Sequence, residues 1–172
     1  YETEADPSMS ANIHALGALK QAGFDTNDST VQSIVSFLKN RQLFKSFWYD
    51  KWHASPYYAT SHAIIVGSGY INNEVLAGPV DWLLSTQRND GSWGYYNIAT
   101  AEETAYALQA LLIWLRNGGD VPKEKLTKGL NWLKENSQPP YPSLWICKAL
   151  YSPELIIRST IYSALLLGEE IL

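Results

Sequence analysis

A stretch of about a dozen residues recurs along the chain, and this recurrence restricts the fold more than any other feature. Residues 37–48 (FLKNRQLFKSFW) align without a gap with residues 82–93 (WLLSTQRNDGSW), and each stretch places a glutamine six residues before a tryptophan. Residues 132–145 (WLKENSQPPYPSLW) follow the same pattern, with one extra residue before the glutamine and another before the tryptophan. Sequence similarity at intervals of roughly 20–50 residues is typical of repeat proteins. We therefore predict a tandem array.

Each repeat contains two kinds of helix. One kind has a single apolar stripe at helical spacing, which predicts an outer helix covered on one face. The other kind is apolar nearly all round, which predicts a helix covered on every side. The outer helices are expected around residues 31–38, 76–83 and 126–133, and the covered ones around 62–66, 104–115 and 156–167. This alternation predicts an all-α fold, an α/α barrel (toroid) of alternating inner and outer helices, incomplete as a fragment.

An open two-helix solenoid is the alternative architecture, although its two layers should differ less in polarity.

The length of 172 residues fits one domain, which we expect to span residues 1–172. The net charge of −4 provides no basic stripe and argues against a nucleic-acid partner. Cys147 is the only cysteine, which excludes a disulfide framework or thiolate zinc cluster and suits a cytoplasmic location. Because Tyr1 begins neither a signal peptide nor an initiator methionine, we expect a piece of a longer polypeptide.

The joint between the two helices of a repeat is predicted to be structural. Gly91 favours a tight turn, because glycine tolerates a positive φ. Gln87 lies where an outer helix should end, so its amide can bond freed backbone carbonyls or the amides of the next helix. Trp93 is expected to fold back over the joint. Gln42 and Trp48 should have the same roles in the first repeat.

A Q-x-x-x-G-x-W joint between helices of an α/α barrel resembles the QW repeat of the class II terpene cyclase superfamily. This superfamily includes squalene-hopene cyclases and the diterpene cyclases related to copalyl diphosphate synthase. Residues 5–19 (ADPSMSANIHALGAL) resemble the helix shortly downstream of the catalytic aspartates in microbial class II diterpene cyclases. Residues 47–63 (FWYDKWHASPYYATSHA) and 143–166 resemble a W-x-D-K-W-x-x-S-x-Y-Y segment and the C-terminal helices of these enzymes. The resemblance covers nearly the whole chain and favours diterpene-type over triterpene-type members.

The resemblance implies that the middle aspartate of a D-x-D-D motif protonates a terminal alkene. No such motif occurs in this chain, and in the family it lies just upstream of the helix that contains SMSANIHAL. We therefore expect the isolated chain to be inactive. The implied reaction of the parent enzyme is cyclisation of a polyprenyl diphosphate, geranylgeranyl diphosphate being the expected substrate, to a labdane-type diphosphate. A fragment of a squalene-hopene-type triterpene cyclase and a non-catalytic α/α-repeat binding module are the alternatives.

Two acidic stretches come nearest to the missing motif, and both have a structural explanation. In DTND, Asp25 and Asp28 lie between helices, and Asp28 or Ser29 is expected to cap the following helix. In AEETA, Glu102 and Glu103 occupy the first turn of a helix, where negative charge is favoured by the helix dipole. A catalytic role for either glutamate is disfavoured.

His14 is the candidate partner of the acid that lies outside this chain. The resemblance places it where family members have the His or Asn that hydrogen-bonds the catalytic Asp. The structural alternative is a buried histidine bonded to a backbone carbonyl. Asn12 either shares the partner role or caps local structure.

Aromatic faces can stabilise a carbocation without attacking it. Trp52, Tyr57 and Tyr58 lead into an inner helix, so we expect at least one of them to line the cavity, core packing being the alternative. His62 begins the same helix and is a further candidate for substrate binding. Lys51 resembles a basic residue near the diphosphate in plant relatives.

The resemblance also implies partners. They are the polyprenyl diphosphate, Mg²⁺ bound weakly to the diphosphate in the full-length enzyme, the missing N-terminal part and γ domain of the same polypeptide, and a second copy in a homodimer. No residue of this chain is predicted to bind a metal. Arg158, the only charge within residues 156–167, is expected to pair with Glu154.

Overall fold

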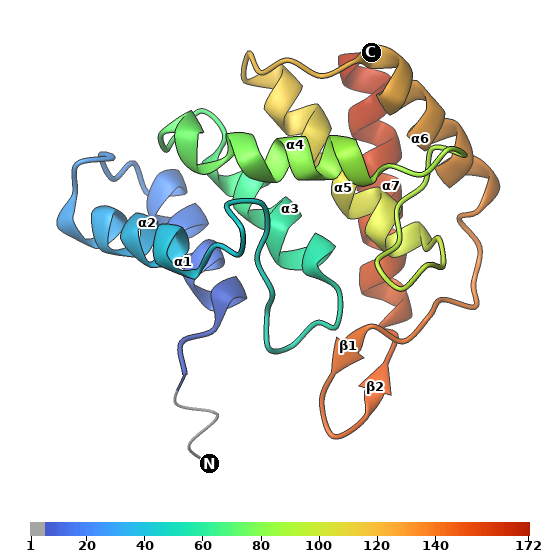
Figure 1. Ribbon diagram of the computed structural model, residues 1–172, viewed down its shortest axis with the longest axis horizontal. Coiled ribbons are helices and arrows are strands. Elements are labelled where there is room, and N and C mark those ends of the chain that lie inside the picture. Colours follow the sequence, from blue (N-terminus) through green and yellow to red (C-terminus); the bar gives the residue numbers. More distant parts are fainter. Residues whose placement is uncertain (1–5) are drawn as a thin grey trace.

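The computed structural model describes residues 6–172, which are mostly helical (Figure 1). The α-helices of these residues are α1 (Met9–Gln21), α2 (Ser29–Arg41), α3 (Pro56–Gly67), α4 (Ala77–Thr86), α5 (Ala101–Arg116), α6 (Lys123–Glu135) and α7 (Glu154–Ile171). A short 3-10 helix, η2 (Asn73–Val75), precedes α4. Strands β1 (Trp145–Ile146) and β2 (Leu150–Tyr151) form a small antiparallel hairpin before α7, with Trp145 opposite Tyr151.

The helices form two layers, which confirms the predicted all-α architecture of alternating inner and outer helices. Helices α1, α3, α5 and α7 pack against one another in this order and form the inner layer. Helix α2 packs on α1, α4 on α3 and α5, and α6 on α5 and α7. The inner layer is open, with α1 and α7 at its two ends (Figure 1).

Burial follows from position in the layers. Helix α5, in the middle of the inner layer, is buried almost all round, and every residue from Ala101 to Leu108 is buried. The outer helix α6 buries only one stripe, formed by Leu126, Gly129, Leu130 and Leu133. The prediction of full cover for inner helices therefore holds for α5.

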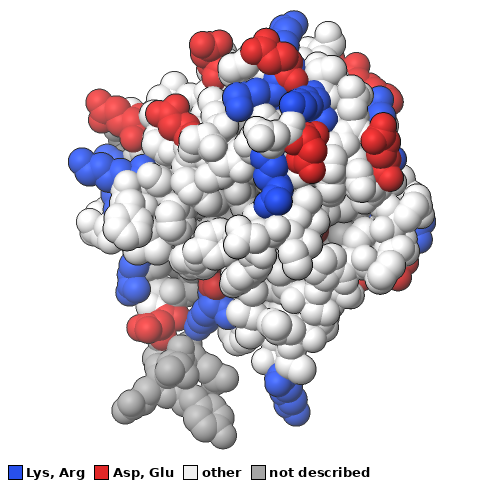
Figure 2. Space-filling view, turned by 45° about the vertical axis from the view of Figure 1, so that its right-hand side comes forward, with Lys and Arg blue, Asp and Glu red and all other residues white. Residues whose placement is uncertain are grey.

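The same prediction is wrong for α7. This helix buries one face through Ile157, Ile161 and Ala164, but Leu155 is 80% exposed and Leu166 is 65% exposed. The reason is that α7 ends the open layer and packs mainly against α5 and α6. On the face shown in Figure 2, Lys and Arg side chains intermingle with Asp and Glu near the top of the view, and a broad area without charged side chains lies below them.

Side-chain caps explain where several helices begin. The carboxylate of Asp28 accepts hydrogen bonds from Thr30 N and Val31 N, so Asp28, and not Ser29, is the N-cap of α2. Thr100 caps α5 by accepting from the backbone N–H of Glu103. The two glutamates of AEETA therefore lie in the first turn of α5, as predicted.

The first two joints between outer and inner helices have the same geometry. Trp48 and Trp93 are fully buried. The indole N–H of Trp48 donates to Leu38 O at 2.8 Å, and that of Trp93 donates to Leu83 O at 2.8 Å. Each indole thus satisfies a carbonyl that the end of the outer helix leaves without an intrahelical partner.

The glutamine amides of these joints bond backbone carbonyls of neighbouring segments. Gln42 Nε2 donates to Val75 O in η2 at 3.0 Å. Gln87 Nε2 donates to Gly91 O and to Lys125 O, both at 2.9 Å, and so ties the joint to the first turn of α6. Gly91 has φ of +98°, as a tight turn requires.

Candidate functional site

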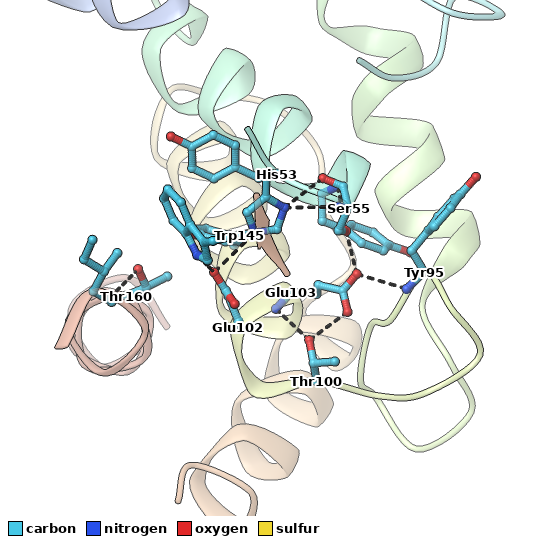
Figure 3. A network of polar contacts seen from close by, with 12 residues as sticks. His53, Ser55, Tyr95, Thr100, Glu102, Glu103, Trp145 and Thr160 are labelled. Atoms are coloured by element: carbon cyan, nitrogen blue, oxygen red, sulfur yellow. Dashed lines mark hydrogen bonds and ion pairs between the residues drawn. The ribbon is translucent and has the colours of Figure 1, made fainter. Parts of the chain in front are cut away.

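The loop before α3 and the β hairpin meet at one end of the inner layer. His53 lies in this loop and forms an isolated antiparallel bridge with Trp145. Ala54 N donates to Leu144 O at 2.8 Å, and Ile146 N donates to Trp52 O at 2.9 Å. These backbone bonds fix the His53 side chain above the start of α5, where Glu102 and Glu103 are located (Figure 3).

Glu102 is the centre of the polar contacts at this end. Its Oε1 accepts hydrogen bonds from Trp145 Nε1 at 2.7 Å and Tyr106 OH at 3.2 Å. His53 Nε2 lies 3.3 Å from the same oxygen and donates to it, because Ser55 N donates to His53 Nδ1 and the proton is therefore on Nε2. Its Oε2 is buried and has no hydrogen-bond partner among the described residues. The three donors come from the hairpin, from α5 and from the loop before α3. All of them converge on one carboxylate oxygen.

The neighbouring carboxylate of Glu103 differs from that of Glu102 in its hydrogen bonds. Its Oε1 accepts from Ser55 Oγ at 2.5 Å and Tyr95 N at 3.0 Å, and its Oε2 accepts from Thr100 Oγ1 at 2.7 Å. Both oxygens are paired, and the partners belong to helix caps and to the joint before α5. Glu103 is thus a structural anchor for the starts of α3 and α5 (Figure 3).

Six rings contact one another at this end of the inner layer, three of them are bonded to Glu102, and together they are called the ring cluster below. They belong to His14, His53, Tyr58, His62, Tyr106 and Trp145. Tyr58 is at their centre: its ring stacks on His53 with centroids 4.9 Å apart and lies 5.5 Å from Tyr106 and 5.2 Å from Trp145. The ring of His62 lies 4.6 Å from Tyr58 and 5.4 Å from His14. All three histidines of the chain belong to this cluster.

His62 is held in its neutral form. Burial lowers the pKa of His62 to about 4, although its hydrogen bond to Tyr58 O at 2.8 Å acts in the opposite direction. Because a carbonyl accepts only from an N–H, the proton lies on Nδ1 and the lone pair on Nε2. Burial also raises the pKa of Tyr106, and the nearby Glu102 carboxylate adds to this effect.

The structure brings together three of the residues that the sequence singled out. His14 lies on the exposed side of α1, and its Nε2 is 3.4 Å from Tyr58 OH. Tyr58 and His62 lie on α3 and complete this group. The ring cluster also contains His53, Tyr106 and Trp145, which sequence reasoning did not select. The adjacent glutamates of AEETA and the small number of histidines are the signals that point to this site.

The other candidates lie elsewhere. Asn12 Nδ2 donates to Ser8 O within the first turn of α1. Lys51 donates to Asp6 O, and its ammonium lies 5.4 Å from the centroid of the half-exposed Trp52 ring. Tyr57 is directed towards the outer layer, with its ring 4.7 Å from that of Trp82 in α4, and burial raises its pKa to about 12.

The aspartate of the DKW segment holds α1 in place. Asp50 is buried and accepts hydrogen bonds from Ser8 Oγ, Ser10 N, Ser10 Oγ and Trp52 N. The carboxylate therefore links the start of α1 to the loop that carries His53. This link sets the position of His14 relative to Tyr58.

The described part of the chain, residues 6–172, contains no group of three His, Cys, Asp or Glu side chains placed to hold a metal ion. Within the same residues, no helix combines the length and the apolar character needed to cross a bilayer.

Arg158 pairs with Glu154 on the exposed face of α7, with Nη1 and Oε1 3.5 Å apart.

The two layers and the joints of glutamine, glycine and tryptophan define an α/α-barrel protein of the terpene cyclase type. Residues 2–152 match the family described as the squalene-hopene cyclase C-terminal domain, and the chain belongs to this family. This result confirms the resemblance found in the sequence.

The individual proteins to which this chain is similar include diterpene cyclases and copalyl diphosphate synthases. The chain is 42% identical over 172 residues to a type B diterpene cyclase from Mycobacterium tuberculosis, with 99% of this chain and 34% of the relative covered. It is 36% identical to a copalyl diphosphate synthase from Streptomyces anulatus, with 95% and 31% covered. A solved structure, the ent-copalyl diphosphate synthase from Streptomyces platensis, superposes with a TM-score of 0.84 at 35% identity and covers 95% of this chain and 34% of that protein. The chain thus spans about a third of the length of these relatives.

Proposed function

We propose that residues 1–172 form part of one α/α-barrel domain of a class II terpene cyclase. The complete enzyme protonates and cyclises a polyprenyl diphosphate, and geranylgeranyl diphosphate and a labdane-type diphosphate are the proposed substrate and product. Relatives named diterpene cyclase and copalyl diphosphate synthase, at 36–42% identity, support this choice over a triterpene substrate. The proposed location is the cytoplasm.

The ring cluster is the observation that carries the proposal. It lies on inner helices α1, α3 and α5, on the loop before α3 and on the hairpin, and it places aromatic faces beside a neutral histidine. Aromatic faces attract cations through their quadrupoles without forming bonds to them. A surface of this kind suits a reaction in which a carbocation must survive until it cyclises.

His14 is the proposed partner of the acid supplied by another part of the polypeptide. Its ring is exposed, while contact with Tyr58 and His62 restricts its position. A hydrogen bond that stabilises the anion of a carboxylic acid makes the acid stronger. Asn12, two residues earlier, keeps its side-chain oxygen free of the bond to Ser8 and is the second candidate.

The remaining parts of the polypeptide are proposed to complete the barrel. The exposed apolar side of α7, with Leu155 and Leu166, supports this, because solvent contact with large apolar side chains is unfavourable. Mg²⁺ is implied for the diphosphate, and none of the described residues is assigned to the metal, because they provide no matching group of ligands.

The test uses the full-length polypeptide that contains this sequence. It is incubated with geranylgeranyl diphosphate and Mg²⁺, and the dephosphorylated products are identified by gas chromatography and mass spectrometry. We expect a bicyclic labdane-type alcohol from the full-length protein and none from residues 1–172 alone. Cyclised product from residues 1–172 alone, or conversion of squalene in place of the diphosphate by the full-length protein, would refute this assignment.

A further inference from the structure

The proposed function leaves the Glu102 carboxylate without a role. This carboxylate is 1% exposed, and one of its oxygens is buried with no hydrogen-bond partner in the part of the chain that the structure describes. Removing a carboxylate from water is unfavourable unless its charge is compensated, and a low local dielectric strengthens the field of any charge that remains. The structure concentrates the donors on Oε1, and among residues 6–172 it provides no hydrogen-bond partner for Oε2.

The donors to Glu102 are themselves rings of the cluster. The shortest of the three bonds, at 2.7 Å, comes from the indole N–H of Trp145, and the phenol of Tyr106 donates at 3.2 Å. A hydrogen bond to an anion is stronger than one to a neutral acceptor. It also draws the proton away from the ring and increases the electron density of the π system. The carboxylate therefore makes the faces of these rings more negative.

The cluster has a buried part and an accessible part. Tyr58, Tyr106 and His53 are buried, whereas Trp145 and His62 are half-buried and His14 is exposed. Trp145 combines the shortest bond to Glu102 with an accessible ring. Tryptophan is also the side chain whose face attracts a cation most strongly.

We propose that Glu102 is a positioning residue that turns the ring cluster into a binding site for a delocalised cation, such as an isoprenoid carbocation. The inference rests on the proposed function for the identity of this cation. Glu102 does not touch the ligand. It acts through Trp145 and Tyr106, whose rings it orients and makes more negative.

The test compares a charged ligand with a neutral one of the same shape. The charged probe is a polyprenyl tertiary amine, which carries an ammonium at neutral pH, and the neutral probe is its hydrocarbon counterpart. Both are titrated calorimetrically into the full-length polypeptide. In Glu102→Gln, which keeps the shape and removes the charge, we expect the preference for the ammonium to fall roughly tenfold.

Glu103→Gln is the matched control. Glu103 is the next residue, is equally buried at 1% exposed, and has both oxygens paired with Ser55, Tyr95 and Thr100, none of which belongs to the ring cluster. This substitution should lower the melting temperature and leave the ammonium preference unchanged. An unchanged preference in Glu102→Gln, or an equal fall in both variants, overturns the inference.

A second variant covers the case in which Glu102→Gln does not fold. Tyr106→Phe keeps the ring and removes one donor to Glu102, and it should lower the ammonium preference about threefold; no change would overturn the inference. The binding assay needs no turnover, so its result is separate from that of the product assay. If the wild-type protein forms no cyclised product, but the preference for the ammonium still falls in Glu102→Gln, the proposed function is contradicted and the inference about Glu102 is not.

Discussion

The first two joints and the third connect the same kinds of helices but use their tryptophans differently. Trp48 and Trp93 are fully buried and donate to carbonyls of the preceding outer helix. Trp145 is half-buried and donates instead to Glu102 on the inner helix α5. Gln138 is exposed and, among residues 6–172, its amide bonds its neighbour Ser137 alone, whereas Gln87 ties two segments together.

The two extra residues of the third repeat account for this difference. With a longer connection, the tryptophan no longer lies over the end of its own outer helix, and its N–H is available to another acceptor. Tyr141, which lies between Gln138 and Trp145 in this connection, is buried, and its hydroxyl donates to Ser137 O just after α6. The third repeat thus has the sequence pattern of the structural joints, while its tryptophan, Trp145, contributes to the candidate site.

The largest expected effect comes from exchanging each tryptophan for alanine. Trp93→Ala removes a fully buried side chain and leaves a cavity, so it should lower the free energy of unfolding by about 3–5 kcal/mol. Trp145→Ala should lower it by clearly less, because solvent already reaches part of the indole. Urea unfolding of the full-length polypeptide, followed by circular dichroism, measures both. Equal losses would remove the distinction between the joints.

The ring cluster should also respond to acid. The pKa of His62 is lowered from 6.5 to about 4 in the folded state, so the unfolded chain binds more protons between these values. Stability should therefore fall as the pH decreases from about 6.5 to about 4, by roughly 2 kcal/mol because part of the ring is exposed. His62→Gln should reduce this slope in melting temperatures recorded across the pH range. An unaltered slope would assign the acid sensitivity to other groups.

The turn of the second joint provides a smaller effect. In Gly91→Ala the new Cβ would lie 2.7 Å from Lys128 C and O, at a φ of +98°. Gly118→Ala is the control, since Gly118 has φ of +85° and nothing within 4 Å of an added Cβ. Backbone strain alone should cost about 1 kcal/mol in both variants, and the contact should add a further ~1–2 kcal/mol in Gly91→Ala. Identical melting temperatures would show that the α6 backbone moves aside freely.

The smallest difference concerns the glutamines. Gln87→Ala leaves Gly91 O and Lys125 O without their amide donor and should cost about 1 kcal/mol. Gln138→Ala should change the free energy of unfolding by less than about 0.5 kcal/mol, because Gln138 is exposed. Chemical denaturation of the two variants side by side provides the comparison. A loss at Gln138 as large as that at Gln87 would mean that the third joint is braced after all.

The layers and the turn at Gly91 could be predicted from the sequence, because helical periodicity and turn residues are local properties. The ring cluster could not, since it requires the loop before α3 to lie against the hairpin before α7. The helix dipole accounts for Glu102 and Glu103 equally well, so it cannot reveal that their partners differ. An apolar sequence indicates which surface of a helix needs cover and says nothing about whether a neighbour provides it, so the exposure of α7 cannot be predicted from its residues.

The distances along the chain that the hydrogen bonds span have a consequence for the order of folding. The indole bonds of the first two joints link residues 10 positions apart, whereas Glu102 is bonded to Trp145 and His53 across 43 and 49 positions. Closing a longer loop costs more chain entropy, so we expect the joints to form early and the ring cluster to form only after the repeats have stacked. An intermediate could then contain nearly all of its native helices while the candidate site does not yet exist.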